Sequence, residues 1–515
     1  MCFMGYDIIF IVGELYFDHP LCGMAILKRW LEKNGFSVGL IEMPKSEEDI
    51  KELGKPNLFF AISSGSIDSM VRNYTPLKKL RSEDQYLDYT NYVPDRAVIV
   101  FSNWVRKNFK GSPIVLGGTE ASLRRFVHYD YWDNKLRKPI LFDSRADILI
   151  YGSAEKQILE IAQKIKNKES LENIPGTCII SKSVPENFEI IPDFNEVTNS
   201  KEKFCQMQNQ FSTIKNLAQK IDNRYILQYK NPIYTPKDLD EYYELPFSRK
   251  SPKSLRGFEF SVVTHRGCIG ECNFCSITLL QGNKLVSRSE ESIIREIKEM
   301  TKLPFFKGNI DDLGGPSANM YGMDCHLCEK SCLDCKKLDR SNNRLINLLK
   351  KIRGIPGIKN VYIRSGIRYD LVSPEYLKEV AEHHIYDTLK IAPEHINKNV
   401  LNLMNKDYGN LKQFLKDFKE LNCRKDLSFY FMTAHPGSSM DEAYELANFI
   451  KQLHHAETTQ VFTPTPMTIS TCMYYTSLDP KTKKKIYVPY TYFEKKQQKR
   501  VIFQNRSDYE NDISG

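Results

Sequence analysis

Apolar runs of strand length alternate with amphipathic stretches along the first 150 residues of the chain. Residues 7–13 are almost wholly apolar, and residues 23–35 follow with apolar side chains at helical spacing. Further strand-length apolar runs lie at residues 37–41, 57–63, 114–118 and 148–152. Apolar strands that alternate with helices predict a doubly wound parallel sheet with ligands at the carboxyl ends of its strands. We therefore expect an α/β, Rossmann-like N-terminal domain over residues 1–195.

The second half of the chain shows a similar alternation after a polar, proline-containing stretch. Residues 196–252 carry few apolar runs and read as a linker. Beyond them, strand-length apolar runs recur at residues 258–263, 305–310, 361–365, 388–392, 427–432 and 459–462. Six β-α units predict a partial (β/α)6 barrel, an open relative of the TIM barrel, over residues 253–480. Residues 481–515 form a basic C-terminal segment.

Polar residues follow each strand of the predicted barrel. The first strand leads into three cysteines, and the later strands are followed by Asp311–Pro316, Arg364–Arg368, Pro393–His395, Thr433–Gly437 and Thr463–Pro466. Functional residues of such barrels sit at the carboxyl ends of the strands. Six polar strand ends in one ring therefore predict a single site built around the cysteine loop.

The three cysteines of this loop are Cys268, Cys272 and Cys275, in the spacing C-x3-C-x2-C. Close-set cysteines of this kind are typical of iron–sulfur clusters. Three thiolates can hold three irons of a 4Fe–4S cluster and leave the fourth iron open for a small ligand. Zinc and a disulfide fragment are the alternatives, but structural zinc prefers four ligands, usually as two separated pairs.

A second cysteine group follows, with the spacing C-x2-C-x3-C-x2-C. Its members are Cys325, Cys328, Cys332 and Cys335. Both zinc and a second iron–sulfur cluster fit four thiolates so close in sequence. Four ligands close the coordination shell, so we expect a structural or electron-relaying site.

Composition restricts the environment and the partners. Seven of the 13 cysteines fall in the two groups, which favours metal binding in a reducing cytoplasm over a disulfide scaffold. No secretory signal or membrane-length apolar run is present, so we expect a cytoplasmic protein with no membrane partner. Residues 481–506 hold nine Lys or Arg and one acid, a large part of the net charge of +9. This segment suits either contact with RNA or an acidic partner, or a solvated helix face.

Two polar motifs in the N-terminal domain leave alternatives open. The tandem Arg124 and Arg125 could bind an anionic group, or could pair with Glu120 and Asp130 in a structural network. The predicted fold resembles cobalamin-binding domains, whose signature is D-x-H-x-x-G. Here the Asp of Asp18–His19 directly precedes the His, and the next Gly lies four residues on. We therefore expect no bound cobalamin and a structural or substrate-facing role for Asp18–His19.

Several longer stretches together resemble the YgiQ-type radical S-adenosylmethionine (SAM) proteins. These stretches are Asp18–Pro20, Gly117–Arg125, His128–Trp132, the C-x3-C-x-Phe-C loop, Asp312–Tyr321, Ala392–His395 and Met473–Thr476. The resemblance implies a cobalamin-domain-like N-terminal region, a radical SAM core, a 4Fe–4S cluster and SAM. It also implies that Gly314–Gly315 meets the SAM amino group, although Pro316 replaces the acidic residue of the usual motif. Arg364 and Glu394 become candidates for the SAM carboxylate and ribose, or else form a mutual ion pair.

The function implied is that of a radical SAM enzyme with an unknown substrate. It would cleave SAM reductively to a 5′-deoxyadenosyl radical and would need an electron donor such as a flavodoxin or ferredoxin. The alternative is a non-catalytic iron–sulfur or zinc protein that binds RNA through its basic C-terminal segment. Methylthio transfer is disfavoured, because Cys2, Cys22 and Cys178 are scattered rather than clustered.

Overall fold

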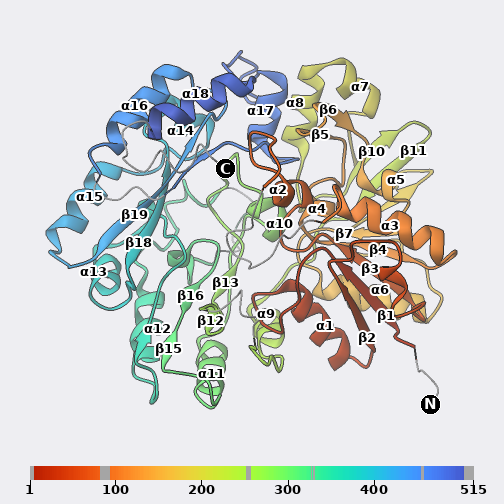
Figure 1. Cartoon of the computed structure of the whole chain (residues 1–515), viewed down its shortest axis with the longest axis horizontal. Helices are drawn as coiled ribbons and strands as arrows, with labels where there is room; N and C mark the ends of the chain where they lie inside the picture. The colour runs from red at the N-terminus through yellow and green to blue at the C-terminus, as the bar shows by residue number, and fades with distance from the viewer. Residues whose placement is uncertain are drawn as a thin grey trace. The chain divides into compact units, whose positions relative to one another are not determined.

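The computed structural model describes residues 5–81, 93–250, 257–325, 328, 331–453 and 458–503. The chain divides into two compact units (Figure 1). Unit 1 comprises residues 1–233, 245–248 and 464–485, and unit 2 comprises residues 234–244, 249–463 and 486–515. Each unit is therefore assembled from three separate stretches of chain. These divisions differ from the expected ones, which placed boundaries at residues 195, 252 and 480.

A nine-stranded sheet forms the centre of unit 1, in the order β2-β1-β3-β4-β7-β8-β11-β10-β9. Its first five strands pair in parallel and confirm the expected doubly wound arrangement. They are β1 (Ile8–Val12), β2 (Val38–Glu42), β3 (Phe59–Ser63), β4 (Ile114–Leu116) and β7 (Ile148–Ile150). Every residue of β1 and β3 is buried, as expected of strands covered on both faces.

The other four strands of this sheet were not predicted. They are β8 (Thr177–Ser181), β9 (Glu189–Ile191), β10 (Leu217–Ile221) and β11 (Arg224–Gln228). Antiparallel pairing joins β7 to β8, β8 to β11 and β11 to β10, so the complete sheet is mixed. Much of the expected linker 196–252 is therefore regular structure: it contains β10, β11, α8 (Lys201–Gln210), α9 (Pro236–Tyr243) and most of α7 (Phe194–Asn199).

Helices and short elements complete unit 1. They are α1 (Gly23–Lys33), η1 (Asp49–Lys51), α2 (Ser69–Asn73), α3 (Ala97–Asn108), α4 (Gly118–Ser122), β5 (His128–Asp130), β6 (Lys135–Arg137), α5 (Ile140–Ser144) and α6 (Glu155–Lys166). The segment 464–485, with α17 (Ile469–Thr476), also belongs here rather than to the barrel. It is held against α8, where Gln208 Nε2 donates to Met467 O at 2.6 Å and Asn209 Nδ2 donates to Pro480 O at 2.8 Å.

Unit 2 is the expected partial barrel. Its strands are β12 (Ser261–Val263), β15 (Asn309–Ile310), β16 (Asp312–Gly314), β17 (Asn360–Val361), β18 (Thr388–Glu394), β19 (Asp426–Thr433) and β20 (Thr458–Val461). The ladders between them are parallel. β15 and β16 act as one bent strand, because the first pairs with β17 and the second with β12. A bridge from Ile367 to Ile391 connects the chain after β17 to β18.

The helices of unit 2 follow these strands. They are α10 (Ile277–Gln281), α11 (Glu290–Met300), α12 (Asn343–Arg353), α13 (Pro374–His383), α14 (Lys398–Leu403), α15 (Leu411–Glu420), α16 (Met440–Ile450) and α18 (Tyr492–Phe503), with the short β13 (His265–Arg266), β14 (Val286–Ser287), η3 (Ala318–Met320) and η4 (Tyr369–Leu371). Ser289 caps α11 as predicted and accepts a hydrogen bond from Ser292 N at 3.1 Å. Among the described residues, no helix has the length and apolarity that a membrane crossing needs.

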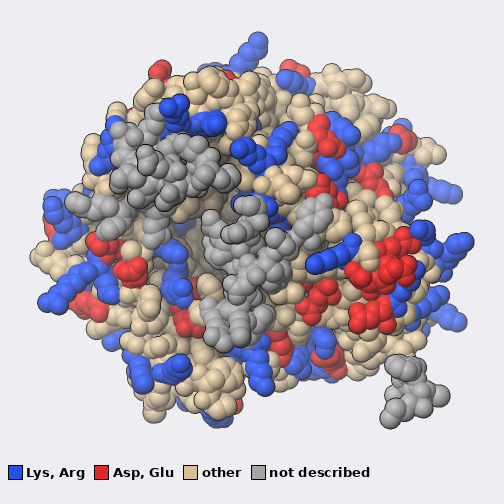
Figure 2. Space-filling view, in the orientation of Figure 1, with Lys and Arg blue, Asp and Glu red and all other residues tan. Residues whose placement is uncertain are grey.

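The basic C-terminal segment is only partly a solvated face. Within α18, Lys495 and Gln498 are buried, and the Gln498 side chain accepts from Thr433 Oγ1 at 3.1 Å. Over the described part of the face shown in Figure 2, Lys and Arg side chains are interspersed with Asp and Glu. Among the described residues, this face therefore carries no continuous basic patch of the kind that RNA binding favours.

Candidate functional site

The cysteine loop of unit 2 is fixed at both ends by hydrogen bonds to other segments. On one side, Cys268 N donates to Gly282 O at 3.2 Å. On the other side, Asn273 N donates to Met404 O at 2.9 Å, and Asn405 Nδ2 donates to Glu271 O at 2.9 Å. The loop comes after β12, as the sequence predicted, with only the two-residue β13 (His265–Arg266) between them. The chain after α10 and the chain after α14 hold the loop in place.

Two buried cations lie close to the cysteines. Arg368 forms a 2.7 Å ion pair with Asp370, and its Nη1 lies 3.7 Å from Cys272 Sγ. Lys406 forms a 3.1 Å ion pair with Glu394. Burial alone would lower the pKa of Lys406, but Glu394 and Cys272 outweigh burial and raise it, so this side chain is charged. These cations can compensate the negative charge of bound thiolates, which a buried site requires.

Burial also affects the thiols themselves. It raises the pKa of Cys268, and it raises the pKa of Cys275 to about 12. The peptide N–H of Gly270 donates to Cys268 Sγ at 3.4 Å, a contact that favours the thiolate. In the part of the chain that the structure describes, no three His, Cys, Asp or Glu side chains converge closely enough to hold a metal ion. The donor set and its cations suit a thiolate-bound cluster, and the ligand assignments remain predictions.

The Gly314–Gly315 pair lies at the carboxyl end of β16, next to β12. Gly314 O accepts from Thr264 N at 2.8 Å, and Thr264 Oγ1 lies 2.9 Å from His265 Nδ1. A Cβ atom built on Gly315 would lie 2.6 Å from His265 Cε1. The close approach that requires glycine at this position is therefore made by a histidine ring of the protein. From the sequence, a ligand was expected in this place.

Strained backbone marks two neighbouring strand ends of the barrel. Glu394, the last residue of β18, has φ of 68°, and Ala434, directly after β19, has φ of 57°. Non-glycine residues in this region are uncommon and cluster at functional sites. Glu394 Oε2 and His395 Nε2 are buried and make no hydrogen bond to any described residue. Both atoms are therefore available to a ligand at the end of β18.

The two residues assigned to SAM contacts have separate partners. Arg364 Nη1 donates to Gly257 O at 2.8 Å, and its guanidinium lies 5.1 Å from the Phe258 ring centroid. Glu394 pairs with Lys406. Lys406 connects Glu394 to the cysteine loop, since its Nζ lies 5.7 Å from the Phe274 ring centroid. The Arg364 side chain instead contacts the segment that precedes β12 and the Tyr386 ring. Neither residue forms the mutual ion pair considered from the sequence.

Two family models cover most of the chain. The model described as radical SAM N-terminal matches residues 2–261, and the radical SAM superfamily model matches residues 262–450. A UPF0313 protein from Methanocaldococcus jannaschii is 44% identical, in an alignment covering 99% of this chain and 91% of the relative. The chain belongs to the YgiQ-type UPF0313 family of radical SAM proteins. A second UPF0313 protein, from Fusobacterium nucleatum, is 41% identical over 98% of this chain and 96% of the relative.

Solved structures with a similar fold are more distant in sequence. The radical SAM methyltransferase TsrM from Kitasatospora setae, with cobalamin and a 4Fe–4S cluster bound, gives a TM-score of 0.53 at 14% identity, covering 90% of this chain and 77% of that one. OxsB, a cobalamin-dependent SAM radical enzyme, gives 0.52 at 13% identity, covering 88% of this chain and 53% of that one. At these identities the likeness shows the fold of this UPF0313 protein and leaves the absence of cobalamin as a prediction.

The second cysteine group of the UPF0313 chain lies near the first. Of its members, Cys328 is exposed and Cys332 is buried. Cys332 belongs to one hydrophobic cluster with Ile269 of the first cysteine loop, and Cys268 and Cys335 pack against that cluster. Lys284 Nζ lies 3.4 Å from Cys332 Sγ. A metal at this group stays a prediction, and four residues inside the group (326, 327, 329 and 330) lie outside the described part of the chain.

The open questions about the N-terminal motifs are answered by contacts within unit 1. Arg124 is buried and forms an ion pair with Asp68, and the buried Arg125 donates from Nε to Gln228 Oε1 at 2.7 Å. The tandem arginines are therefore structural. Asp18 forms an ion pair with Arg29 and accepts from Ser248 N at 2.9 Å, while His19 Nδ1 accepts from Leu21 N at 3.0 Å.

Some site residues carried no recognisable sequence signal. Lys406 lies in a polar loop after α14 with no motif around it, and it reaches the site because α14 places it beside β18. His265 is three residues before Cys268, and its ring packs on Gly315. Arg368 follows the third barrel strand, where polar strand ends had been noted without a role for this residue. Strand-end position was the one signal that could have found it.

Replacement of Gly315 by alanine is expected to destabilise the protein. The new methyl group would collide with the buried His265 ring, and overpacking of this kind costs about 1–3 kcal/mol. Urea unfolding of the purified variant measures the loss. Gly23→Ala is the matched control, because nothing lies within 4 Å of a Cβ at that position. An unchanged urea midpoint for Gly315→Ala would contradict the close packing.

Acidification is expected to destabilise the protein between pH 6.5 and about 4. Burial lowers the pKa of His395 from 6.5 to about 4 and that of His435 to about 3. The unfolded chain therefore binds protons in this range that the folded chain does not, and stability falls as the pH falls. The His395 shift corresponds to a loss on the order of 3 kcal/mol. Urea unfolding at several pH values measures the effect. On acidification, His395→Gln should lose less stability than the wild type, and the exposed-site control His383→Gln should lose as much as the wild type.

Proposed function

We propose that this protein is a radical SAM enzyme in which Cys268, Cys272 and Cys275 hold a 4Fe–4S cluster with one iron open for SAM. When bound and reduced, the cluster and SAM supply methionine and a 5′-deoxyadenosyl radical, which takes a hydrogen atom from a substrate. The observation that carries the proposal is the cysteine loop itself, at a barrel strand end beside two buried cations. The family membership supports the same class of chemistry.

The residues around the loop would perform separate tasks. Arg368 and Lys406 would balance the negative charge of the thiolates. Arg368 Nη1 lies 3.7 Å from Cys272 Sγ, and Cys272 helps to raise the pKa of Lys406, whose side chain is 11% exposed. Glu394 Oε2 would accept a hydrogen bond from a SAM hydroxyl or ammonium group, since it has no partner among the described residues. We retain Gly314 and Gly315 as neighbours of the SAM amino group. Arg364 would bind the SAM carboxylate only after release of Gly257 O.

Two further assignments accompany this proposal. We propose that Cys325, Cys328, Cys332 and Cys335 hold zinc or a second iron–sulfur cluster. We also propose that a flavodoxin or ferredoxin delivers the electron that the reaction requires. Metal analysis of a variant with all four cysteines replaced by serine tests the first assignment, because a fall in one metal identifies the ligand set. Unchanged metal content would reject it.

The experiment that tests the proposed function is spectroscopic. The wild-type protein is reconstituted anaerobically with iron and sulfide, reduced, and examined by electron paramagnetic resonance with and without SAM. We expect the spectrum of the reduced cluster to change on SAM addition, because an open iron accepts the ligand. We also expect 5′-deoxyadenosine and methionine to form under dithionite. A spectrum that does not change when SAM is added would instead support a non-catalytic iron–sulfur protein.

A further inference from the structure

Two cysteines outside both cysteine groups lie against each other within unit 1. Cys205 is in α8 and Cys472 is in α17, and both side chains are fully buried. Their sulfur atoms are 3.7 Å apart, although the residues are separated by 267 positions in the sequence. A disulfide requires the two sulfurs to come about 2 Å closer. Side-chain rotation and a small shift of one helix could supply this movement.

We propose that Cys205 and Cys472 form a peroxide-reactive dithiol that closes to an intramolecular disulfide and fixes α17 onto α8. The two helices already pack together through side-chain contacts. Cys205 Sγ lies 3.6 Å from Thr476 Oγ1, and the Phe204 and Tyr475 rings meet edge-on with centroids 5.0 Å apart. The disulfide would thus form between elements that the fold already holds in place. It is independent of the proposed radical chemistry.

The two thiols differ in acidity, which gives each a separate role. The hydrogen bond with Cys472 lowers the pKa of Cys205 to about 7 against the opposing effect of burial, and the nearby Lys483 adds to the lowering. Burial raises the pKa of Cys472 well above its ordinary value. The thiolate is the reactive form of cysteine, so Cys205 is the attacking residue and Cys472 resolves the intermediate.

The reaction with hydrogen peroxide balances in two steps. The Cys205 thiolate attacks one peroxide oxygen, and the O–O bond breaks. A sulfenic acid forms, and the departing hydroxide takes up a proton and leaves as the first water. The Cys472 sulfur then attacks the Cys205 sulfur, the S–O bond breaks, and the second water leaves with the Cys472 proton. Two thiols are oxidised by two electrons, and one peroxide is reduced to two waters.

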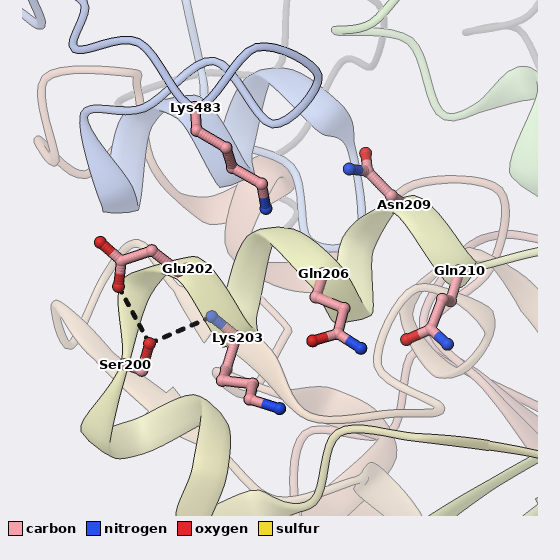
Figure 3. Close-up of a pocket in the computed structure, with 7 residues that line it drawn as sticks. All are labelled: Ser200, Glu202, Lys203, Gln206, Asn209, Gln210 and Lys483. Carbon is pink, nitrogen blue, oxygen red and sulfur yellow. Dashed lines mark hydrogen bonds between the residues drawn. The ribbon is translucent and has the colours of Figure 1, made fainter.

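A pocket is lined by α8 residues on either side of Cys205 and would admit the oxidant. It has a volume of about 570 Å³ and is lined by Ser200, Glu202, Lys203, Gln206, Asn209, Gln210 and Lys483. Figure 3 shows Lys483 extending from the 464–485 segment toward α8. Cys205 lies about one helical turn from both Glu202 and Asn209, so it borders the stripe of α8 that lines the pocket. The cation of Lys483 would also favour the Cys205 thiolate.

Peptide mapping of the full-length protein tests the proposal. The protein is purified anaerobically, treated with one equivalent of hydrogen peroxide, digested without reductant and analysed by mass spectrometry. We expect a cross-linked peptide joining Cys205 to Cys472, lighter than the two thiol peptides by two hydrogen atoms and lost on reduction. Oxidation should raise the thermal unfolding midpoint by about 5 °C, because the disulfide closes a long loop.

Variants separate the two roles and provide the control. Cys472→Ser should leave Cys205 as a sulfenic acid that dimedone traps, whereas Cys205→Ser should give no dimedone adduct at Cys472. Cys178→Ser is the matched control, because Cys178 is equally buried and burial raises its pKa to about 12, so the linked peptide should form unchanged. Free thiols at both positions in wild-type protein, under peroxide that oxidises the half-buried Cys423, would overturn the proposal.

Discussion

Replacing Cys272 by alanine is expected to abolish the iron–sulfur absorbance of the reconstituted protein and to lower 5′-deoxyadenosine formation by on the order of a hundredfold or more. Two thiolates cannot hold three irons of a cluster, so the site would lose the cluster or hold an incomplete one. Iron and sulfide content, visible absorbance and product chromatography measure the effect. Circular dichroism of the variant should match that of the wild type, because the loop backbone donates hydrogen bonds to Gly282 O and Met404 O and accepts one from Asn405 Nδ2.

A matched cysteine exists for this comparison. Cys423 is a half-buried free thiol that packs against the barrel core, with its Sγ 3.6 Å from Lys425 O. Cys423→Ala should retain the full cluster and full SAM cleavage. A Cys272→Ala protein that kept both the absorbance and the product would reject the assignment of this loop as the cluster ligand.

Replacing Arg368 by methionine is expected to lower both the stability of the protein and its cluster content. Arg368 and Asp370 form an ion pair in which both side chains are almost fully buried, at 7% and 5% exposure. Removal of the cation leaves the Asp370 carboxylate buried and unpaired, which costs about 3–5 kcal/mol. The same change removes the guanidinium 3.7 Å from Cys272 Sγ, so cluster content should also fall. Urea unfolding and iron analysis of the same preparation report the two losses.

Two further variants make the Arg368 result interpretable. Arg368→Met combined with Asp370→Asn should regain much of the lost stability, because the buried charge is gone, but it should not regain the cluster. Arg295→Met removes an exposed pair with Glu244 and should leave both readouts unchanged. Full cluster content in Arg368→Met would mean that the guanidinium does not support the cysteine loop.

The fold was predictable wherever apolar runs marked buried strands. The five parallel strands of unit 1 were found because their sequences are largely apolar, as in β1 and β3, whose residues are all buried. β10 was missed because Gln219 and Lys220 interrupt its apolar pattern. Gln219 is nonetheless buried, and its side chain accepts from Val127 N at 2.9 Å and donates to Pro192 O at 2.8 Å. Such a satisfied buried amide is visible only once the tertiary structure is known.

The site was predictable where chemistry dictates spacing and unpredictable where distant segments meet. The three cysteines of the loop lie within eight residues, so their spacing alone indicates a cluster-binding site. Lys406 is far from them in sequence and has no motif, so only the packing of α14 reveals it. Gly315 was singled out correctly as a place of close approach, but the approaching group is His265. A sequence can indicate that space is needed without indicating what occupies it.

Tertiary contacts also decide between the two interpretations of the tandem arginines. From sequence, an anion site and a structural network were equally good interpretations of Arg124 and Arg125. The structure buries both and gives Arg124 the carboxylate of Asp68, which lies 56 residues away and had not been considered as a partner. The carboxylate of Glu120, one of the two partners considered for a structural network, accepts from Ser69 N at 3.1 Å. Ion-pair partners across such separations leave no local pattern.

The three-part composition of unit 1 affects the order in which the chain can fold during synthesis. The ribosome completes the strands of the nine-stranded sheet by residue 233, but the α17 segment that packs on α8 emerges only by residue 485. At ordinary translation rates the delay is on the order of tens of seconds. The finished fold buries Phe204, Cys205 and Met207 of α8. During that interval the α17 segment does not yet pack on them. Nascent chains stalled before residue 464 should therefore bind chaperones through α8, and chains released after residue 485 should not.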